Sequence, residues 1–389
     1  MRVLFFNYEY PPLGGGAGNA SFYLLKEYAK IQDLEVDFVT SSFDEQYHQE
    51  KVGNNITVHR LPIGKNEQNV HFQSQADLLR YTKAALKFSK QLAKQNHYDL
   101  THSFFSVPCG YLSLKLKKKF DIPYIISLRG SDVPGYSERF TLLYKFITPI
   151  IKKIWKHADF VIANSEGLKE LALQSQPAHE IGVIYNGIDI YEFHPESALK
   201  DSKKFRIICV SRVTPRKGIR FLVQAFKTLS EKFSHVELVI IGDGNERKSL
   251  EDLARGLNLG DKINFMGQVP HENLHEHYSK SDVFVLPSLN EGMSNTMLEA
   301  LASGLPIVAT DTGGTKELVT EGVNGFVVEM QDSKDLADKI EKLIEDNQLL
   351  NQMSLASRQR AEQLSWENVA AEYFKVYQET MNIDKMRKE

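Results

Sequence analysis

Short apolar runs alternate with helical stretches along the sequence, and this alternation restricts the fold more than any other feature. The runs are rich in β-branched and aromatic residues, as in strands that are buried on both faces of a parallel sheet. Amphipathic stretches such as residues 75–94 and 220–233 lie between most of them. The pattern predicts an α/β protein with two doubly wound sheets. The expected strands are residues 3–7, 35–40, 56–61, 99–104, 124–128, 160–164 and 182–186, then 205–210, 236–241, 262–267, 282–287 and 306–310.

The chain length supports two domains, because 389 residues exceed one ordinary core. A polar stretch without periodicity at residues 193–204 is the expected boundary. We expect Rossmann-like domains over residues 1–193 and 204–365, and a last helix over residues 366–389 that packs back on the first domain. Ligands of such sheets bind at the carboxyl ends of the strands, so two facing sheets would leave a cleft between them.

Composition excludes several classes of protein. The net charge of −3 argues against a dedicated nucleic-acid binder. There is no apolar run of about 18 residues that could span a membrane. The first residues read as a strand and lack the apolar core of a secretory signal. Cys109 and Cys209 are far apart, which favours reduced thiols over one disulfide. A cytoplasmic protein is therefore predicted.

Glu291 and Glu299 frame a strand-to-helix turn in the second half. Gly292 frees the loop after Glu291, and Ser294 or Asn295 can cap the helix that follows. Glu291 is thus expected before a helix and Glu299 on its early turns. The start of a helix offers free N–H groups and a positive dipole end to a phosphate. A carboxylate about one turn further in can accept hydrogen bonds from sugar hydroxyls.

Arg212 and Lys217 follow the expected strand 205–210, within the sequence SRVTPRKG. Two cations that converge there could bind a diphosphate, Arg212 in bidentate fashion and Lys217 as a point charge. A solvated basic turn is the alternative. The glutamates in the same domain favour the phosphate interpretation.

A glycine-rich turn, residues 14–18, follows the first expected strand and precedes a helix. It matches neither a dinucleotide fingerprint nor a Walker loop, because Asn19 replaces the last glycine of the former and no Gly-Lys-Ser/Thr follows. Small residues at such a turn still let a ligand approach the backbone closely, although a flexible loop is the alternative.

His271 and His275 have the spacing of a zinc-binding helix. The pair follows Pro270 at a helix start, and no third ligand is apparent, although His277 is near. A solvated first turn, in which Glu272 favours the helix dipole, is the preferred interpretation. The sequence contains no Asp-x-Asp pair, so a divalent cation that bridges a diphosphate through that motif is unsupported.

Three polar residues follow strands of the first half. His102 lies near the end of strand 99–104, where it could orient or deprotonate a hydroxyl in the cleft. A packed core histidine is the alternative. Arg129 and Asp132 follow strand 124–128 in the same way.

Lysines cluster on two helical stretches of the first half and could bind an anionic lipid surface. For each cluster alone, a solvated helix face is the alternative. The clusters are Lys115, Lys117, Lys118 and Lys119, then Lys145, Lys152, Lys153 and Lys156.

These residues together resemble the family 4 retaining glycosyltransferases of the GT-B fold. The matching segments are SRVTPRKG, VIIGDGNERKSLEDLA, FMGQVPHENL, DVFVLPS, the run from Glu291 to Glu299, GTKELVTEGVNGFVV and IYNGIDIYEFHP. The glycine-rich turn resembles the family's glycine loop. The resemblance covers nearly the whole chain and is closest over residues 205–330.

The resemblance implies a nucleotide-sugar held mainly by the second domain. Glu299 would bind the ribose hydroxyls, Glu291 would lie near the sugar, and Arg212 and Lys217 would neutralise the leaving diphosphate. The base would lie against the backbone near residues 267–269. The implied donor-binding set is Gly15, Gly16, Arg212, Lys217, Gly242, Val269, Glu291, Met293, Ser294, Asn295, Thr296 and Glu299.

The implied catalytic residues are Arg212, Lys217, Glu291 and His102, and the acceptor-side candidates are His102, Arg129 and Asp132. One departure from the family concerns Arg129, which stands where many members carry a histidine. The role of that histidine cannot be transferred, and Arg129 could instead meet an anionic group on donor or acceptor.

The sequence therefore predicts a retaining transferase that moves a sugar from a UDP- or GDP-sugar to a glycan or lipid-linked acceptor. No metal or other cofactor and no nucleic acid are expected. The resemblance suggests cell-envelope polysaccharide synthesis at the inner face of the plasma membrane, with peripheral contact to anionic lipid. The alternatives are a nucleotide-sugar epimerase or phosphorylase on the same fold, and a non-catalytic partner that binds nucleotide-sugar or lipid.

Overall fold

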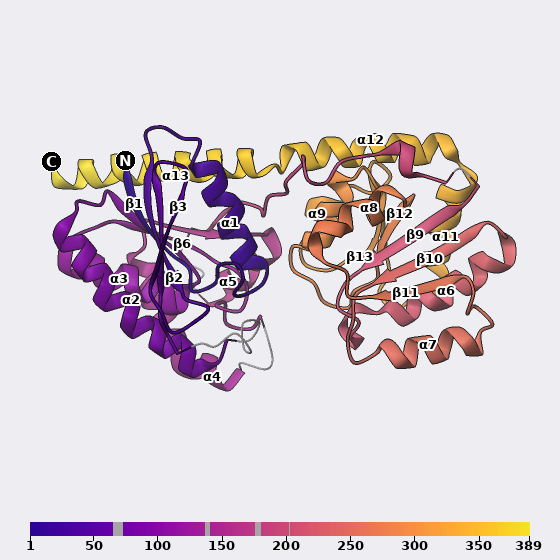
Figure 1. Ribbon diagram of the computed structural model, residues 1–389, viewed down its shortest axis with the longest axis horizontal. Coiled ribbons are helices and arrows are strands. Elements are labelled where there is room, and N and C mark those ends of the chain that lie inside the picture. The colour runs from indigo at the N-terminus through magenta and orange to yellow at the C-terminus, as the bar shows by residue number, and fades with distance from the viewer. Residues whose placement is uncertain (65–72, 137–140, 176–179, 202) are drawn as a thin grey trace. The chain divides into compact units, whose positions relative to one another are not determined.

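The computed structural model describes residues 1–64, 73–136, 141–175, 180–201 and 203–389 (Figure 1). The chain divides into two compact units. The first domain contains Met1–Asn186 and the C-terminal segment Trp366–Glu389, and the second contains Gly187–Ser365. Each is an α/β domain built around its own sheet.

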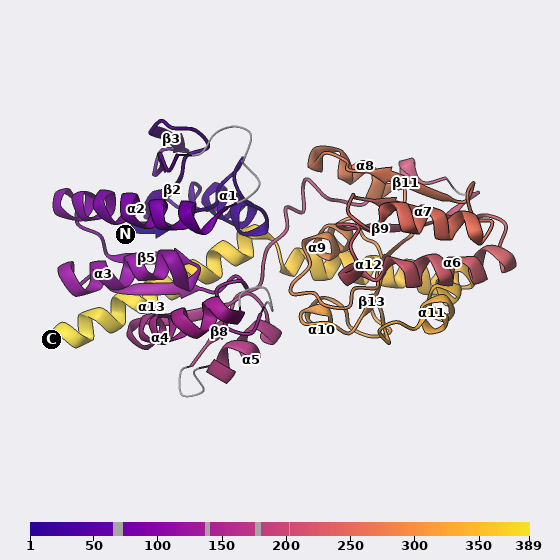
Figure 2. The same cartoon turned by 90° about the horizontal axis from the view of Figure 1, so that it is seen from below.

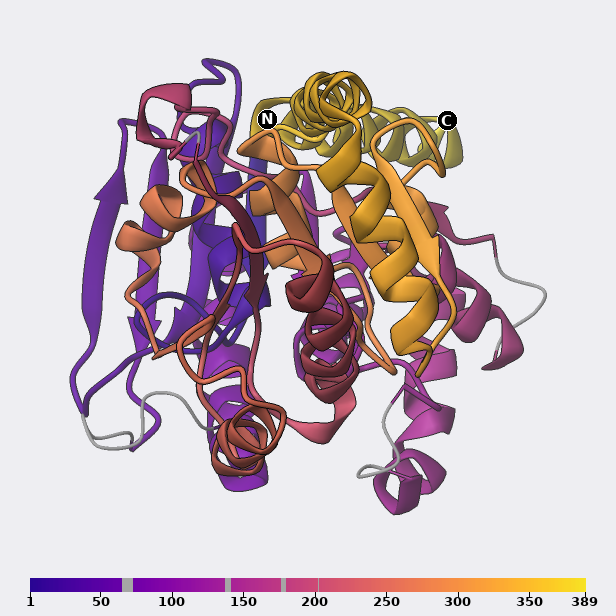
Figure 3. The same ribbon diagram turned by 90° about the vertical axis from the view of Figure 1, so that its right-hand side faces the viewer.

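The first domain is built on an eight-stranded sheet in the order β3-β4-β2-β1-β5-β6-β7-β8. All neighbours are parallel except β3, which pairs with β4 in antiparallel fashion at the edge. Helices α1 and α13 pack together on one face, and α2, α3 and α4 lie on the other (Figures 1 and 3). The strands are β1 (Arg2–Phe6), β2 (Glu35–Ser41), β3 (His48–Val52), β4 (Ile56–Leu61), β5 (Leu100–Phe104), β6 (Tyr124–Ser127), β7 (Phe160–Ala163) and β8 (Gly182–Val183). The helices are α1 (Gly16–Tyr28), α2 (Gln75–Gln95), α3 (Tyr111–Phe120), α4 (Thr141–His157), α5 (Glu166–Ser175) and α13 (Trp366–Lys388).

The second domain has a six-stranded parallel sheet in the order β11-β10-β9-β12-β13-β14. Helix α6 packs with α7 and α11, whereas α9 packs with α8 and α12 (Figure 2). The strands are β9 (Phe205–Val210), β10 (Val236–Ile241), β11 (Ile263–Gly267), β12 (Val283–Leu286), β13 (Ile307–Thr310) and β14 (Gly325–Val328). The helices are α6 (Ile219–Lys232), α7 (Arg247–Gly256), α8 (Leu274–Ser279), α9 (Asn295–Ala302), α10 (Thr315–Leu318), α11 (Ser333–Glu345) and α12 (Asn347–Gln363).

The C-terminal helix α13 completes the core of the first domain. Trp366 stacks on Tyr23, with 5.8 Å between ring centroids and 6° between planes. The Tyr28 hydroxyl donates to that of Tyr377 over 2.9 Å. Tyr373 and Tyr377 are both buried. The core of the first domain therefore combines the two ends of the chain.

Three features differ from the sequence-based expectation. Strands β3 and β14 were not among the expected strands, and the second domain begins at Gly187, before the polar stretch. The earlier start has a physical cause, because Ile188 pairs with Ser365 and Phe193 is buried. Cys109 and Cys209 are free and buried, as predicted. Within the described ranges, no helix is both long and apolar enough to cross a membrane.

Candidate functional site

Two loops meet at the carboxyl edge of the second sheet, one after β9 and one after β12. These strands are neighbours, so their ends lie side by side. The Leu289 N–H donates to the Arg216 carbonyl over 2.8 Å. Gly218 has a φ of +60°, and a Cβ there would overlap the Pro287 carbonyl oxygen. Only glycine permits both this conformation and this close approach, so Gly218 fixes the position of the basic turn.

Lys217 and Glu291 form an ion pair across these loops. The Ser288 hydroxyl also donates to Glu291, over 3.3 Å. Both members of the pair are largely buried, with side chains 16% and 18% exposed. The loop that bears Glu291 is held from its other side by Gly314, at which a Cβ would come within 2.8 Å of the Gly292 carbonyl oxygen. The structure thus brings a cation and a carboxylate together where the sequence predicted a phosphate and a sugar.

Helix α9 starts directly after this loop. Ser294 is its N-cap, and its hydroxyl accepts from the Met297 N–H over 3.4 Å. The N–H groups of Asn295 and Thr296 have no intrahelical acceptor, because they belong to the first turn. The helix therefore presents donors and the positive end of its dipole at the sheet edge.

Glu299 lies in the second turn of α9 and is 6% exposed. The Tyr278 hydroxyl donates to its Oε2 over 2.8 Å, and His271 Nε2 lies 3.4 Å from its Oε1. Burial raises the pKa of Tyr278 well above its ordinary value, and the Glu299 charge raises it further, so this phenol remains a donor. Glu291 and Glu299 thus have different partners, and Glu299 is held in place from α8.

His271 lies in the exposed turn before α8 that the sequence suggested, and its ring in addition bridges two carboxylates. Its Nδ1 lies 3.2 Å from Glu192, and its Nε2 faces Glu299. The hydrogen bonds to Glu192 and Glu299 raise the pKa of His271 to about 10. Its ring is therefore charged at neutral pH, and it neutralises part of the buried charge on Glu299. Sequence spacing could not reveal this role, because both partners lie far away along the chain.

The His271→Gln variant should be less stable than wild type over the pH range in which His271 of the wild type is protonated. A raised pKa means that the stabilisation is complete below the ordinary histidine pKa of about 6.5 and disappears as pH rises through about 10. The melting temperature of wild type should thus exceed that of the variant at pH 6, and the two should converge at pH 10. His97→Gln is a matched control, because His97 is 88% exposed. A wild-type advantage that persists at pH 10 would contradict the assignment.

Three other expected donor residues lie at the same edge. Arg212 is exposed, and its side chain makes no hydrogen bond or ion pair with another residue of the described chain. The Gly242 N–H donates to the Gly267 carbonyl over 2.8 Å, which joins the ends of β10 and β11. Val269 follows β11 and is partly exposed. Within the described ranges, no hydrogen bond or ion pair links Arg212 to Lys217 or Glu291.

The glycine-rich turn leads into α1 in the first domain. Helix α1 begins at Gly16, and the Gly15 N–H donates to Glu9 over 3.3 Å. Burial raises the pKa of Glu9 although the Gly15 and Gly18 N–H groups oppose this. A Cβ on Gly15 would meet no atom within 4 Å. A carboxylate therefore already lies where the sequence placed a diphosphate against Gly15 and Gly16.

His102 is a core residue, contrary to its expected position in a cleft. It is fully buried, and its ring stacks on Phe5 with 4.4 Å between centroids. Its Nδ1 is 2.7 Å from the Tyr377 hydroxyl and its Nε2 is 2.8 Å from that of Ser127. Burial lowers the pKa of His102 well below its ordinary value. Both ring nitrogens are occupied inside the domain, so His102 is not available to an acceptor.

Asp132 is also a structural residue and not an acceptor-side group. It is buried, and it accepts hydrogen bonds from the N–H groups of Arg129 and Ser106 over 2.9 and 2.7 Å. The Arg129 guanidinium donates to Asn186 over 2.8 Å and lies 3.4 Å from the centroid of the Phe104 ring. Its Nε is buried without a hydrogen-bond partner among the described residues. Arg129 is thus held by its own domain, with one donor unused.

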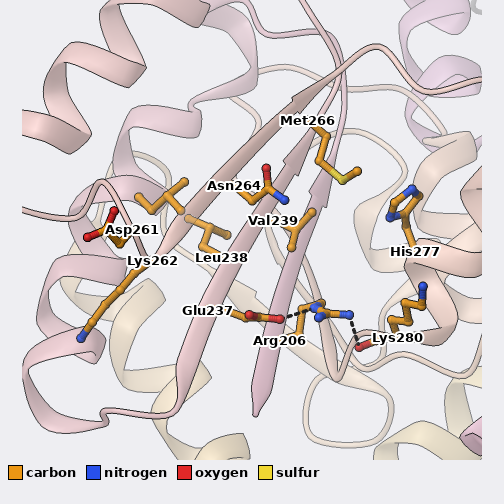
Figure 4. A pocket seen from close by; sticks show the side chains of 11 residues that line it. Arg206, Glu237, Leu238, Val239, Asp261, Lys262, Asn264, Met266, His277 and Lys280 are labelled. Atoms are coloured by element: carbon orange, nitrogen blue, oxygen red, sulfur yellow. Dashed lines mark hydrogen bonds and ion pairs between the residues drawn. The ribbon is translucent and has the colours of Figure 1, made fainter. Parts of the chain in front are cut away.

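A cavity of 490 Å³ in the second domain lies along β9, β10 and β11, with Met266 of β11 at one end and Arg206 and Glu237 at the other (Figure 4). Its lining includes Arg206, Glu237 and Ile263, which stand at the starts of β9, β10 and β11. Arg206 pairs with Glu237 and donates to the Lys280 carbonyl over 3.1 Å. The lining of this cavity includes neither Lys217 nor Glu291 nor Glu299.

Solved structures of other proteins share the fold of this chain. The sucrose-phosphate synthase of Thermosynechococcus elongatus has a TM-score of 0.81 at 23% identity, over 98% of this chain and 99% of that one. Anabaena HepE in complex with UDP-glucose has a TM-score of 0.71 at 20% identity, over 97% and 100%. The fold is therefore that of the GT-B glycosyltransferases.

Two family models match adjoining parts of the sequence. Glycosyltransferase Family 4 matches residues 14–192, and Glycosyl transferases group 1 matches residues 191–360. The chain thus belongs to the glycosyltransferase family that these models describe. It is also similar to N-acetyl-alpha-D-glucosaminyl L-malate synthase of Bacillus anthracis, at 27% identity over 96% of each chain.

Proposed function

We propose that the protein transfers a sugar from a nucleoside diphosphate sugar to a hydroxyl, with retention of anomeric configuration. The arrangement at α9 carries this proposal. Glu299 is buried and fixed by Tyr278 and His271, next to a capped helix start and the Lys217–Glu291 pair. Glu299 can accept hydrogen bonds from ribose hydroxyls. The N–H groups of the helix start and the Lys217 ammonium can bind phosphates. The structural neighbour solved with UDP-glucose supports a nucleotide-sugar donor.

In the proposed reaction, the acceptor oxygen bonds to the anomeric carbon on the face from which the diphosphate departs. The bond between that carbon and the β-phosphate oxygen breaks, and the acceptor proton passes to the departing phosphate. Lys217 and Arg212 stabilise the charge that develops on the diphosphate, a role that fixed cations can fill without a metal. Glu291 positions the sugar and does not form a covalent bond to it.

A donor screen tests the proposal directly. The melting temperature of the full chain is measured with UDP-, GDP- and ADP-sugars, because a ligand of the folded state raises it. The stabilising donor is then incubated with and without a pool of glycan acceptors in EDTA. We expect release of nucleoside diphosphate only with acceptor, and a product with the anomeric configuration of the donor by NMR.

Other outcomes of the screen would overturn parts of the proposal. Isomerisation of the donor without acceptor would identify an epimerase. Transfer to inorganic phosphate would identify a phosphorylase. Donor binding without turnover on any acceptor would indicate a non-catalytic partner. An inverted product would contradict retention alone.

A specific surface of the first domain favours contact with anionic lipid. Phe146 and Ile150 on α4 are 78% and 43% exposed, beside the exposed Lys152 and Lys153. Helix α3 packs against α4, and repulsion from Lys153 lowers the pKa of the exposed Lys118 on α3. An anionic surface would relieve this repulsion and cover the apolar side chains. We propose that a lipid-linked acceptor is used at such a surface; the Lys145 side chain lies outside the described residues.

Vesicle binding tests this surface. Each basic side chain near an anionic membrane contributes about 1 kcal/mol, so Lys153→Glu should weaken binding to vesicles with phosphatidylserine about tenfold or more. Phe146→Ser should weaken it as well. Lys200→Glu in the second domain is the control. Binding that is equal for all variants, or for neutral vesicles, would exclude this surface.

A further inference from the structure

A cluster of two histidines and a glutamate lies on the second domain, apart from the groups assigned above. One potential ligand atom from each of His194, Glu196 and His275 lies within 4.8 Å of the others. The rings of His194 and His275 are stacked, with centroids 4.4 Å apart and planes inclined by 17°. His275 Nε2 is 3.3 Å from Glu196 Oε2. Nitrogen and oxygen ligands thus already converge.

The backbone beneath the cluster is held firmly. The Arg358 guanidinium donates to the carbonyls of Ile190 and Phe193 over 3.1 and 3.0 Å, and Phe193 is 1% exposed. The Ser279 hydroxyl donates to the His194 carbonyl over 3.4 Å. The segment that bears two ligands is therefore fixed against the helix that bears the third.

We propose that His194, Glu196 and His275 bind one divalent transition metal of the zinc class. Two imidazoles and a carboxylate are a ligand set that zinc accepts, with bonds of about 2.0–2.2 Å. Ligands of one tetrahedral ion lie about 3.4 Å apart, so the groups must close by a small distance. The side chains of His194 and Glu196 are exposed and can turn to do so, which also separates the stacked rings. Water would complete the coordination.

The structure selects a different partner for His275 from the one that sequence spacing suggests. The zinc-like spacing pairs it with His271, but both nitrogens of His271 face Glu192 and Glu299. His194 instead comes from the segment that opens the second domain. Such a site has no local motif, because its ligands come from two distant segments.

Metal at this position would act as a clip. It would join the segment that contains His194 and Glu196 to α8. Helix α8 also carries Tyr278, the hydrogen-bond donor to Glu299. The clip should raise the stability of the folded chain. The metal would supply no group to sugar transfer. The metal site is therefore independent of the proposed reaction.

The test uses the full chain without an affinity tag, stripped with EDTA. Zinc chloride is titrated in a calorimeter, and cobalt chloride is titrated in parallel to follow the visible absorption of a cobalt complex. We expect one ion per chain and a melting temperature that rises with metal concentration. His275→Gln and Glu196→Gln should each weaken binding by about tenfold or more, since weaker perturbations of metal sites already have effects of this size.

His277→Gln is the matched control, because it lies on the same helix two residues from His275 and is not in the cluster. It should bind metal as wild type does. Circular dichroism in EDTA shows whether each variant is folded. No binding by the wild type, or equal affinity in His275→Gln and His277→Gln, would overturn the proposal. Wild-type metal affinity in both His194→Gln and Glu196→Gln would also overturn the proposal.

Discussion

Replacement of Glu299 by alanine should raise the KM for the donor by about a hundredfold or more, with a smaller effect on kcat. The carboxylate is buried and held by Tyr278 and His271, so its position is set before any donor arrives. A hydrogen bond to a charged group contributes about 1.5–3 kcal/mol, and two ribose hydroxyls could each donate one. Initial rates over a range of donor concentrations measure the effect.

The variant also removes one acceptor of the Tyr278 hydroxyl and one carboxylate partner of the His271 ring, although Thr296 and Glu192 remain in reach of them, so Tyr278→Phe is compared with it. Tyr278→Phe removes one support of Glu299 and keeps the carboxylate, and it should change the KM far less than Glu299→Ala does. Glu272→Ala, an exposed residue of the same domain, should leave the KM unchanged. A wild-type KM in a folded Glu299→Ala enzyme would refute the ribose assignment.

Lys217→Ala should lower kcat by about 10²–10³ while the KM for the donor changes little. A positioned group that stabilises charge in the transition state contributes about 2.7–4 kcal/mol in comparable cases, and the diphosphate gains charge as the glycosidic bond breaks. Pre-steady-state release of nucleoside diphosphate with saturating donor measures the loss. Arg216→Ala is the neighbouring control, because Arg216 is exposed and contributes its backbone carbonyl to the loop contact.

The ion pair with Glu291 offers another explanation that a double variant separates. Lys217 could act only by neutralising the largely buried Glu291. In that case Glu291→Gln should restore activity to Lys217→Ala. If Lys217 acts on the leaving group, the double variant should be at least as slow as Lys217→Ala alone. Recovery of kcat in the double variant would reject the proposed role.

Sequence patterns predicted most of the fold because buried parallel strands are continuous apolar runs. Strand β3 escaped because its residues, HQEKV, are polar and lie at a sheet edge, where its side chains remain partly exposed. Strand β14 is only four residues long, and the helix before it, α10, also has only four residues, so the alternation of strand and helix is weak there. Local spacing predicted a cap at Ser294 or Asn295, of which Ser294 is the one used, and it predicted Glu299 on the early turns of the helix.

Side-chain roles that depend on distant partners were harder to predict. The sequence placed His102 correctly in a strand, but His102 is the central residue of β5 and not its end, and the sequence could not show that Tyr377 would cover it. His271 is exposed, as the sequence suggested, but its contacts with Glu192 and Glu299 were not predicted because both residues are remote in sequence. Local motifs thus located the loops of the site, whereas tertiary packing decided which side chains those loops leave available.

The contribution of α13 to the first domain has a consequence for synthesis of the chain. Domains generally fold as units, and the N-terminal one usually does so first as the chain emerges from the ribosome. Here the hydroxyl partners of Tyr28 and His102 belong to Tyr377, near the other end of the chain. The second domain, Gly187–Ser365, is continuous and can reach its native state earlier. The first domain therefore begins to be translated first but can complete its folding only after the second domain has been made.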